Sequence, residues 1–397
     1  MDSISRSLQQ RLQAIQPFLA MELVKQADAL KSAGHDMIYL AIGEPDFTAP
    51  EVVQRAAYAA IQRGDTGYTP ALGLWPLREK IADFYAHAYG LSVDPRRIVI
   101  TAGASGALLL ACAALVGAGD EVLMPDPSYP CNRHFVAAFD GIARLIDCGP
   151  EQRYQLSAKQ VQHHWQASTR GVLIASPSNP TGTSISTIEL HQIIGLVKQR
   201  GGFVLVDEIY QGLSYDVSHS SGNYGFPDSA LSLDPDVITL NSFSKFFCMT
   251  GWRLGWLVVP ESLVAVFEKL AQNLFICPST IAQHAAMACF SDEALDIYQQ
   301  RRAEFKRRRD FLVPAFESLG LSIPVLPDGA FYLWADVRQV ADNSQELAQR
   351  ALQQAHVVLV PGADFGQAQT QYYIRASYAT AFSRLQEAVD RLSRLLN

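Results

Sequence analysis

A strand–helix–strand pattern occupies Gly171–Tyr210, which reads GVLIASPSNPTGTSISTIELHQIIGLVKQRGGFVLVDEIY. The apolar runs Gly171–Ala175 and Phe203–Val206 have the length and the β-branched content of buried strands. Between them, Thr187–Arg200 has the spacing of an amphipathic helix. Two strands joined through a helix indicate a parallel pair within one sheet.

Further strand-like runs extend this pattern in both directions. They are Ile98–Thr101, Glu121–Met124, Val237–Leu240 and Leu254–Val259, and a buried helix is expected over Ala104–Val116. Strands that alternate with helices predict an α/β fold, in which helices sandwich a mostly parallel sheet. Active sites in such sheets gather at the carboxyl ends of the strands, so the residues that directly follow each strand are the first candidates for chemistry.

The pattern changes near the C-terminal third of the chain. Long helices dominate there, and strand-like runs are isolated at 330–334 and 371–376, which predicts a smaller α+β domain. We expect residues 48–285 to form the large domain and residues 286–397 the small one. Residues 1–47 are expected to contribute to the small domain and to a dimer contact.

Composition excludes several classes of protein. With 397 residues, 49% of them hydrophobic and 18% charged, the chain is expected to be globular rather than disordered or fibrous. Its net charge of −7 leaves no basic excess for a nucleic-acid partner. No apolar stretch reaches the roughly 20 residues that cross a membrane, so no membrane contact is expected. The six cysteines lack CxxC spacing, which predicts reduced thiols in a cytoplasmic protein without a metal site.

Lys245 differs from the other seven lysines, which occupy polar or amphipathic helical contexts. It lies within SFSKFFC at 242–248, directly after a predicted strand and among aromatic and small residues. Burial at this position would lower the pKa of the amine and make it a nucleophile toward an aldehyde. The alternative is a lysine whose stem is covered and whose ammonium group stays in water.

Small residues, hydroxyls and an arginine favour an anion site beside this lysine. TAGASG at 101–106 ends a strand and starts a helix, whose free N–H groups attract an anion. Arg253, Ser242 and Ser244 would complete a cup for a phosphate. Two other interpretations stay open for the turn: a helix start without a ligand, and the nucleophile elbow of a serine hydrolase acting through Ser105, although the last glycine of GxSxG is missing.

Other polar side chains stand where ordinary structure does not require them. Asp207 follows the FVLV strand directly, and either a protonated heterocyclic nitrogen or a helix cap could be its partner. Tyr210 lies close enough in sequence to share that site. Prolines could hold Asn179 rigidly at the sheet edge, and the alternative is a loop with ordinary turn residues. Arg375 lies in the apolar run YYIRASY, where a buried guanidinium demands a carboxylate from a ligand or from a structural acid.

Taken in order, these motifs resemble those of the fold-type I pyridoxal-phosphate enzymes, specifically the class I and II aminotransferase family. The most specific part is SFSKFFCMTGWRLG at 242–255, which matches the family's lysine-to-arginine signature. NPTG at 179–182, DEIY at 207–210 and YTPALG at 68–73 are similar to three further family motifs. The resemblance covers nearly the whole chain and implies the family's fold, a large domain with a parallel sheet and a smaller α+β domain.

The resemblance also implies a role for each matching residue. Lys245 would join the aldehyde of pyridoxal 5′-phosphate and move the substrate proton, Asp207 would keep the pyridine nitrogen protonated, and Asn179 and Tyr210 would hydrogen-bond the ring's phenolic oxygen. The phosphate would be held by Ala104, Ser105, Ser242, Ser244 and Arg253, and by Tyr68 of the partner subunit in a homodimer with shared sites. Tyr129 would stack on the ring, while Arg375, Gly43 and Asn179 would bind the substrate.

The implied reaction is ping-pong transfer of an amino group from an L-amino acid to a 2-oxo acid. Neutral or aromatic donors are favoured, because no second arginine for a dicarboxylate is evident and Phe18, Leu19 and Ile42 are apolar where relatives line the side-chain pocket. A polar loop over Ser214–Asp236 is longer than usual and leaves substrate entry open. A β-lyase or synthase with the same cofactor, a serine hydrolase and a non-catalytic regulator are the alternatives.

Overall fold

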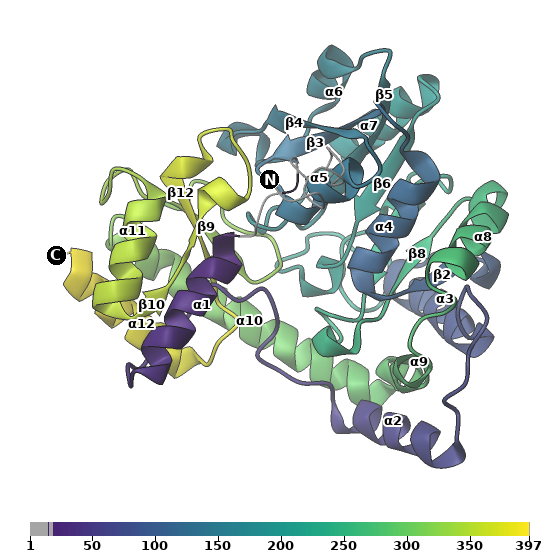
Figure 1. Cartoon of the computed structure of the whole chain (residues 1–397), viewed down its shortest axis with the longest axis horizontal. Helices are drawn as coiled ribbons and strands as arrows, with labels where there is room; N and C mark the ends of the chain where they lie inside the picture. The colour runs from purple at the N-terminus through teal and green to yellow at the C-terminus, as the bar shows by residue number, and fades with distance from the viewer. Residues whose placement is uncertain (1–14, 16–18, 397) are drawn as a thin grey trace, which may run out of the picture.

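A seven-stranded sheet forms the centre of the larger part of the molecule in the computed structural model, which describes residue 15 and residues 19–396 (Figure 1). The strands run in the order β2-β8-β7-β6-β5-β3-β4. Their bounds are β2 (Ile98–Thr101), β3 (Glu121–Asp126), β4 (Ile142–Asp147), β5 (Thr169–Ala175), β6 (Phe203–Asp207), β7 (Ile238–Ser242) and β8 (Gly255–Val258). Only β8 is antiparallel to its neighbours, so the predicted mostly parallel sheet is confirmed.

Within this sheet, β4 is the strand that sequence reasoning missed, and in the smaller part the short strands β10 (Val357–Val358) and β11 (Val360–Pro361) were missed as well. Strand β4 lies at the edge of the sheet, and its residues are mostly exposed or half-buried, so that IARLID shows no continuous apolar run.

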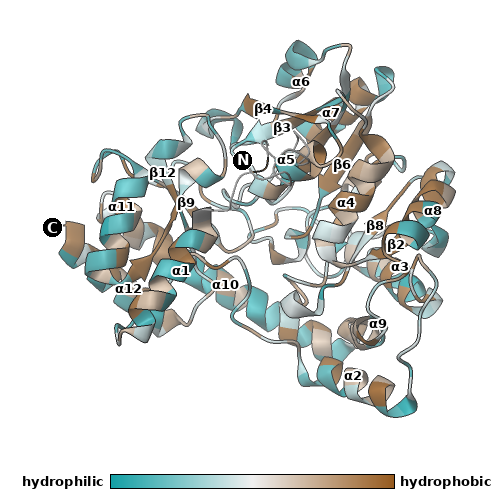
Figure 2. Cartoon of the chain, viewed as in Figure 1, coloured by the Kyte–Doolittle hydropathy of each residue, from teal (hydrophilic) through white to brown (hydrophobic). Residues whose placement is uncertain are grey.

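Both faces of the sheet are covered by helices because apolar side chains project from both. Val172 and Val204 face a cluster with α6 (Ala158–His164) and α7 (Thr187–Gln199), while their neighbours Leu173 and Leu205 face α4 (Gly103–Leu115) and α8 (Val264–Leu274). Figure 2 shows brown, apolar stretches in strands such as β6 and β8, with a brown to white α4 and helices α7 and α8 that mix brown and teal. This alternation explains why the buried strands read as unbroken apolar runs.

The remaining helices of this part connect the strands or pack below them. They are α2 (Glu51–Arg63), α3 (Trp75–Tyr89), α5 (Pro130–Ala137) and α9 (Thr280–Ala286).

The smaller part joins the two ends of the chain. Strand β1 (Ile38–Tyr39) pairs in parallel with β10 (Val357–Val358), and a second, antiparallel sheet has the order β11-β12-β9. The other elements are α1 (Leu19–Ser32), β9 (Tyr332–Asp336), α11 (Ser344–Arg350), β11 (Val360–Pro361), β12 (Tyr373–Ser377) and α12 (Phe382–Leu396). The N-terminal segment therefore packs with C-terminal elements, whereas the boundaries at residues 47 and 285 stay predictions.

Helix α10 (Asp292–Ser318) runs from the α2 side of the molecule to the small sheet (Figure 1). From sequence, its basic residues Arg301–Arg302 and Lys306–Arg309, with Glu304 and Asp310 among them, indicate a solvated helix face. This prediction is wrong for Arg308 and Arg309, which are buried. Arg308 contacts Asp46 at 2.7 Å, and Arg309 contacts Asp216 at 2.6 Å. The arginines are buried because the helix passes between the two parts and their acids come from distant segments.

Neither a membrane-spanning helix nor a disulfide bond is present among the described residues. Among the described residues, no helix is long and apolar enough to cross a membrane. All six cysteines are free, as predicted, and four of them are buried. A cytoplasmic location stays a prediction.

Candidate active site

A cavity of about 470 Å³ opens at the carboxyl ends of β5, β6 and β7, in front of the first turn of α4. Residues from α1, β9 and β12 close its other side. Its walls contain twelve of the residues singled out from the sequence: Ile42, Gly43, Ala104, Ser105, Tyr129, Asn179, Asp207, Tyr210, Ser244, Lys245, Arg253 and Arg375. Parallel-sheet topology brings these residues together from segments far apart in the chain.

The amine of Lys245 lies inside this cavity. Its Nζ donates a hydrogen bond to the carbonyl oxygen of Gly43 and lies 5.8 Å from the ring centres of Tyr210 and Phe331. Burial, and secondarily the charge of Arg375, lower the pKa of Lys245 to about 8. A lysine whose ammonium group stays in bulk water does not fit these surroundings, because the amine is enclosed in the cavity and donates to a backbone carbonyl.

The carboxyl group of Asp207 ends strand β6 at the bottom of the cavity. One oxygen accepts a hydrogen bond from the backbone N–H of Ile209 at 3.0 Å, as in an Asx turn. Burial raises the pKa of Asp207 to about 7, although the charge of Lys245 acts in the opposite direction. A buried carboxyl with a single N–H donor has unused capacity for a cationic partner.

The start of α4 and Arg253 form one end of the cavity. Gly103 has a φ of +72°, and a Cβ there would lie 2.7 Å from the Arg253 guanidinium, so glycine lets the two come together. Arg253 donates to the carbonyl oxygen of Thr250 at 2.9 Å. The free N–H groups of the helix and the guanidinium therefore point to an anion at this end.

The two serines of the predicted phosphate cup differ in position. Ser244 lines the cavity, whereas Ser242 is fully buried and is not part of its wall. The Ser242 hydroxyl lies 2.9 Å from Ser244 Oγ and 3.2 Å from the carbonyl oxygen of Leu254. Ser242 therefore supports Ser244 from behind, because strand β7 ends at Ser242 with its side chain turned into the protein.

Arg375 lies on β12 at the opposite end of the cavity and is only 2% exposed. Its guanidinium donates to Asn179 Oδ1 at 3.0 Å and to the carbonyl oxygen of Ala41 at 2.6 Å, and its Nε has no acceptor among the described residues. No carboxylate of the described chain forms an ion pair with it. The structural-acid alternative thus fails for Arg375, and a buried cation is left for a ligand.

Sequence reasoning missed Tyr332, whose hydroxyl lies 2.8 Å from that of Tyr210 and whose ring stacks against the Arg375 guanidinium at 4.5 Å. Tyr332 sits in an apolar strand, and nothing in its local sequence distinguishes it from a core residue. Other cavity residues not singled out include Thr250, Leu108 and three side chains of α1, Ala20, Met21 and Val24.

Four of the predicted residues differ in where they lie relative to the cavity. Ile42 lines the cavity, Leu19 starts α1, and Phe18 lies outside the described residues. Tyr68 is 84% exposed in the loop between α2 and α3 and does not line the cavity of its own chain. The serine-hydrolase alternative has no support here, because no histidine is among the described residues that line the cavity with Ser105.

The fold and this cavity together define an enzyme of the fold-type I pyridoxal-phosphate class. The chain belongs to the family "Aminotransferase class I and II", whose model matches residues 35–392. It is thus an aminotransferase of a pyridoxal-phosphate-dependent family that acts in amino acid metabolism.

Individual relatives differ in the substrates that their names give. The chain is 36% identical to valine–pyruvate aminotransferase of Mycobacterium tuberculosis, over 95% of this chain and 96% of that protein. It is 33% identical to aromatic-amino-acid aminotransferase 2 of Thermococcus litoralis, over 98% of each chain. The structure of Thermus thermophilus aspartate aminotransferase with maleate superposes on this chain with a TM-score of 0.91 at 31% identity. The match covers 98% of this chain and 100% of the other.

Proposed function

We propose that this aminotransferase holds pyridoxal 5′-phosphate in the described cavity, joined to Lys245, and transfers amino groups from neutral or aromatic L-amino acids to 2-oxo acids by a ping-pong mechanism. When bound, the cofactor supplies an aldehyde for the amine and a ring that accepts the electrons of the substrate Cα–H bond. The cavity volume of about 470 Å³ lies within the range of small-molecule sites.

The side chains at each end of the cavity fit the chemical groups of this cofactor. The anion-binding end formed by Ala104, Ser105, Ser244 and Arg253 suits the phosphate. The Asp207 carboxyl suits the pyridinium nitrogen, because a cationic partner stabilises its ionised form in the buried site. Tyr129 offers an aromatic face, and Asn179 and Tyr210 offer polar groups for the ring oxygen.

Lys245 would act twice. Its lowered pKa makes the neutral amine available near neutral pH as a nucleophile. The same Nζ, once released, would remove the proton from the substrate Cα and return it to the carbon that had been the cofactor's aldehyde. The carbonyl oxygen of Gly43 accepts a hydrogen bond from the amine and holds it within the cavity.

A single observation carries the substrate assignment: the guanidinium of Arg375 is buried without a carboxylate partner in the described chain. An α-carboxylate would satisfy its charge and its free Nε, with Asn179 and the Gly43 backbone beside it. Because every amino acid and 2-oxo acid has this carboxylate, one arginine serves both halves of the reaction.

The rest of the cavity wall suits a substrate with a neutral or aromatic side chain. Met21, Val24 and Ile42 are apolar, and Glu44 adds a negative charge to the rim. Among the described residues, the only cations that line the cavity are Lys245, Arg253 and Arg375, which the amine, phosphate and α-carboxylate roles occupy. A second carboxylate in the substrate would therefore lack a charged partner and meet Glu44 instead.

A homodimer is part of the proposal. Tyr68 is exposed and apart from its own cavity, which suits a residue that completes the phosphate site of a second copy. Exposed apolar side chains on nearby segments support a buried contact there, among them Tyr58, Ile61, Leu274 and Ile276.

The test is a panel of amino donors mixed one at a time with the purified, cofactor-loaded enzyme. We expect neutral and aromatic donors to convert the cofactor to its amine form within one turnover, and a 2-oxo acid to reverse the change. Faster conversion by aspartate and glutamate would contradict the substrate proposal. Release of pyruvate and ammonia without the amine form would instead favour a β-lyase.

A further inference from the structure

Tyr332 lines the active-site cavity, and the proposed function gives it no role. It is the first residue of β9 and is fully buried. Its hydroxyl lies 2.8 Å from that of Tyr210, which is its only hydrogen-bond partner among the described residues. The two rings pack edge-on with their centres 5.8 Å apart. The two phenols therefore form one unit, which joins the small sheet to the segment that follows β6.

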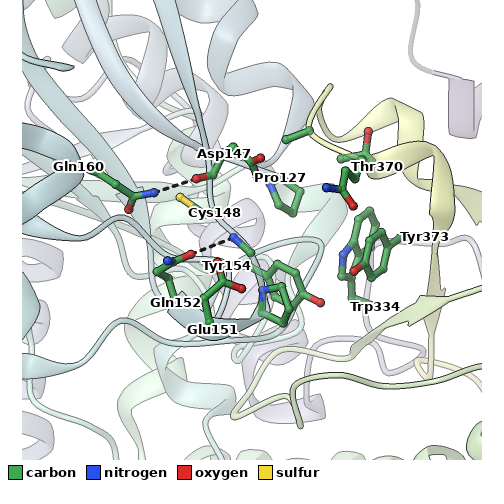
Figure 3. A pocket seen from close by; sticks show the side chains of 14 residues that line it. Pro127, Asp147, Cys148, Glu151, Gln152, Tyr154, Gln160, Trp334, Thr370 and Tyr373 are labelled. Atoms are coloured by element: carbon green, nitrogen blue, oxygen red, sulfur yellow. Dashed lines mark hydrogen bonds between the residues drawn. The ribbon is translucent and has the colours of Figure 1, made fainter. Parts of the chain in front are cut away.

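A row of packed rings fixes the position of the Tyr332 side chain. The Arg375 guanidinium carbon lies 4.5 Å from the centre of the Tyr332 ring and 4.9 Å from the centre of the Phe365 ring. Phe365 packs edge-on against Trp334. Figure 3 shows the far end of the row, where Trp334 stacks on Tyr373 with ring centres 5.2 Å apart. Because each ring is held by the next, the Tyr332 side chain cannot turn without displacing its neighbours.

The hydroxyl of Tyr332 also lies against the backbone of Gly43. A Cβ built on Gly43 would lie 3.0 Å from the hydroxyl oxygen, so glycine permits this close approach. The carbonyl oxygen of the same Gly43 accepts the hydrogen bond of the Lys245 amine. Backbone therefore closes one side of the Tyr332 oxygen, and its hydrogen-bond partner, Tyr210, lies on another.

The two hydroxyls carry two hydrogens, and their mutual contact uses one of them. A phenol has one hydrogen to donate and an oxygen that accepts, so one hydroxyl donates to the other and the second hydrogen stays free. If Tyr332 donates to Tyr210, the free hydrogen belongs to Tyr210. A buried hydroxyl hydrogen without an acceptor costs free energy, so an acceptor placed beside Tyr210 favours this direction over the reverse.

We propose that Tyr332 is a positioning residue, whose hydroxyl donates to the oxygen of Tyr210 and thereby aims the Tyr210 O–H at the phenolic oxygen of the cofactor. This inference rests on the proposed function, which places that oxygen beside Asn179 and Tyr210. A hydrogen bond from Tyr210 stabilises the ionised phenolic oxygen and weakens its attraction for the proton on the nitrogen that joins Lys245 to the cofactor. The Tyr332 hydroxyl should therefore lower the pKa of that nitrogen.

The charged and titratable groups around the two phenols stay the same in all variants of the test. Those that line the cavity with the phenols in the described chain are Glu44, Tyr129, Asp207, Lys245, Arg253 and Arg375. Differences between the variants therefore report the phenol hydroxyls alone.

The test is a pH titration of the visible absorbance of the cofactor-loaded enzyme, which follows the nitrogen of Lys245 without measuring activity. The variants are Tyr332→Phe, Tyr210→Phe and the double variant Tyr210→Phe/Tyr332→Phe, and urea unfolding checks that each is folded. Tyr85→Phe is the matched control. Tyr85 is also fully buried, and its hydroxyl oxygen accepts from Trp256 Nε1 at 3.3 Å, away from the residues that line the cavity.

We expect Tyr332→Phe to raise the midpoint of the titration by about 0.5–1 pH unit, which corresponds to the loss of one hydrogen bond. Tyr210→Phe should raise the midpoint further. The double variant should match Tyr210→Phe, because the Tyr332 hydroxyl acts only through Tyr210. Tyr85→Phe should titrate as the wild type does.

An unmoved midpoint in Tyr332→Phe would overturn the proposal, and so would single shifts that add up in the double variant. An equal shift in Tyr85→Phe would also overturn it, since the effect would then be a general one. A raised KM for amino donors with an unmoved midpoint would place the free hydrogen on Tyr332 and contradict the proposed direction. A wild type without a visible band after incubation with pyridoxal phosphate would refute the proposed function and this inference with it, whereas the other outcomes refute the inference alone.

Discussion

The strongest prediction compares two buried arginines that differ in their partners. Arg308 contacts Asp46 at 2.7 Å and Glu304 at 2.9 Å, whereas Arg375 has no carboxylate partner in the described chain. If Arg375 is kept for a ligand, the variant Arg375→Met should lose activity with little loss of stability. Arg308→Met should lose stability with little loss of activity.

The magnitudes follow from the contacts. A bidentate pair between Arg375 and a substrate carboxylate comprises two charged hydrogen bonds of about 1.5–3 kcal/mol each, or about 3–6 kcal/mol together. Its loss should lower kcat/KM by roughly 10²- to 10⁴-fold for every donor and acceptor. Arg308→Met leaves Asp46 unpaired and removes one of the two arginines that contact Glu304, so the free energy of unfolding should fall by about 2–4 kcal/mol.

The assay pairs steady-state kinetics on several donors with urea unfolding of both variants. Arg375→Met should affect all carboxylate substrates alike, because the α-carboxylate is common to them. The reasoning is refuted if Arg375→Met unfolds as easily as Arg308→Met while retaining activity. It is also refuted if only one donor is affected, since that would place Arg375 at the substrate side chain.

Four further predictions follow from the cavity. Lys245→Ala should bind the cofactor without a borohydride-reducible link and lose turnover by orders of magnitude, and near-native turnover would argue against its role. In the cofactor-free wild type, the rate at which the protein captures pyridoxal phosphate should rise with pH around a midpoint near 8, because the neutral amine is required. A midpoint near the ordinary lysine pKa of 10.5 would count against burial of the amine. Burial raises the folded-state pKa of both Asp207 and Glu208 to about 7, so the stability of the cofactor-free protein should fall as pH rises from about 4 through 7. Asp207→Asn should reduce that fall, leaving the part due to Glu208, and should still impair turnover. Urea unfolding across pH would check the change in stability, and an undiminished fall would count against the raised pKa of Asp207. Mixing Lys245→Ala with Tyr68→Phe subunits should restore activity if a dimer shares its sites, because one site of the hybrid regains both residues, and no recovery after verified exchange would contradict shared sites.

The sheet and the cavity were largely predictable because their signals are local. Unbroken apolar runs identify the buried strands, and parallel topology places the residues after them at one edge. Asp207, Asn179 and Lys245 each follow such a run, so their meeting in one cavity follows from the fold. A strand at the sheet edge, β4, lacks that signal, since half of its surface faces water.

What could not be predicted depends on partners from distant segments. Tyr332 reads as a core residue, and only the pairing of β9 with β12 brings it against Arg375. Arg308 looks like one charge in a solvated run, because its acid Asp46 lies 262 residues away.

The central claim is that the amine of Lys245 binds the cofactor covalently, and a peptide map tests it most directly. The purified enzyme is reduced with borohydride, digested, and analysed by mass spectrometry for the pyridoxyl phosphate adduct. The account predicts one stable adduct, on the peptide that contains Lys245. An adduct on another lysine, or a protein that carries none after incubation with pyridoxal phosphate, would contradict it.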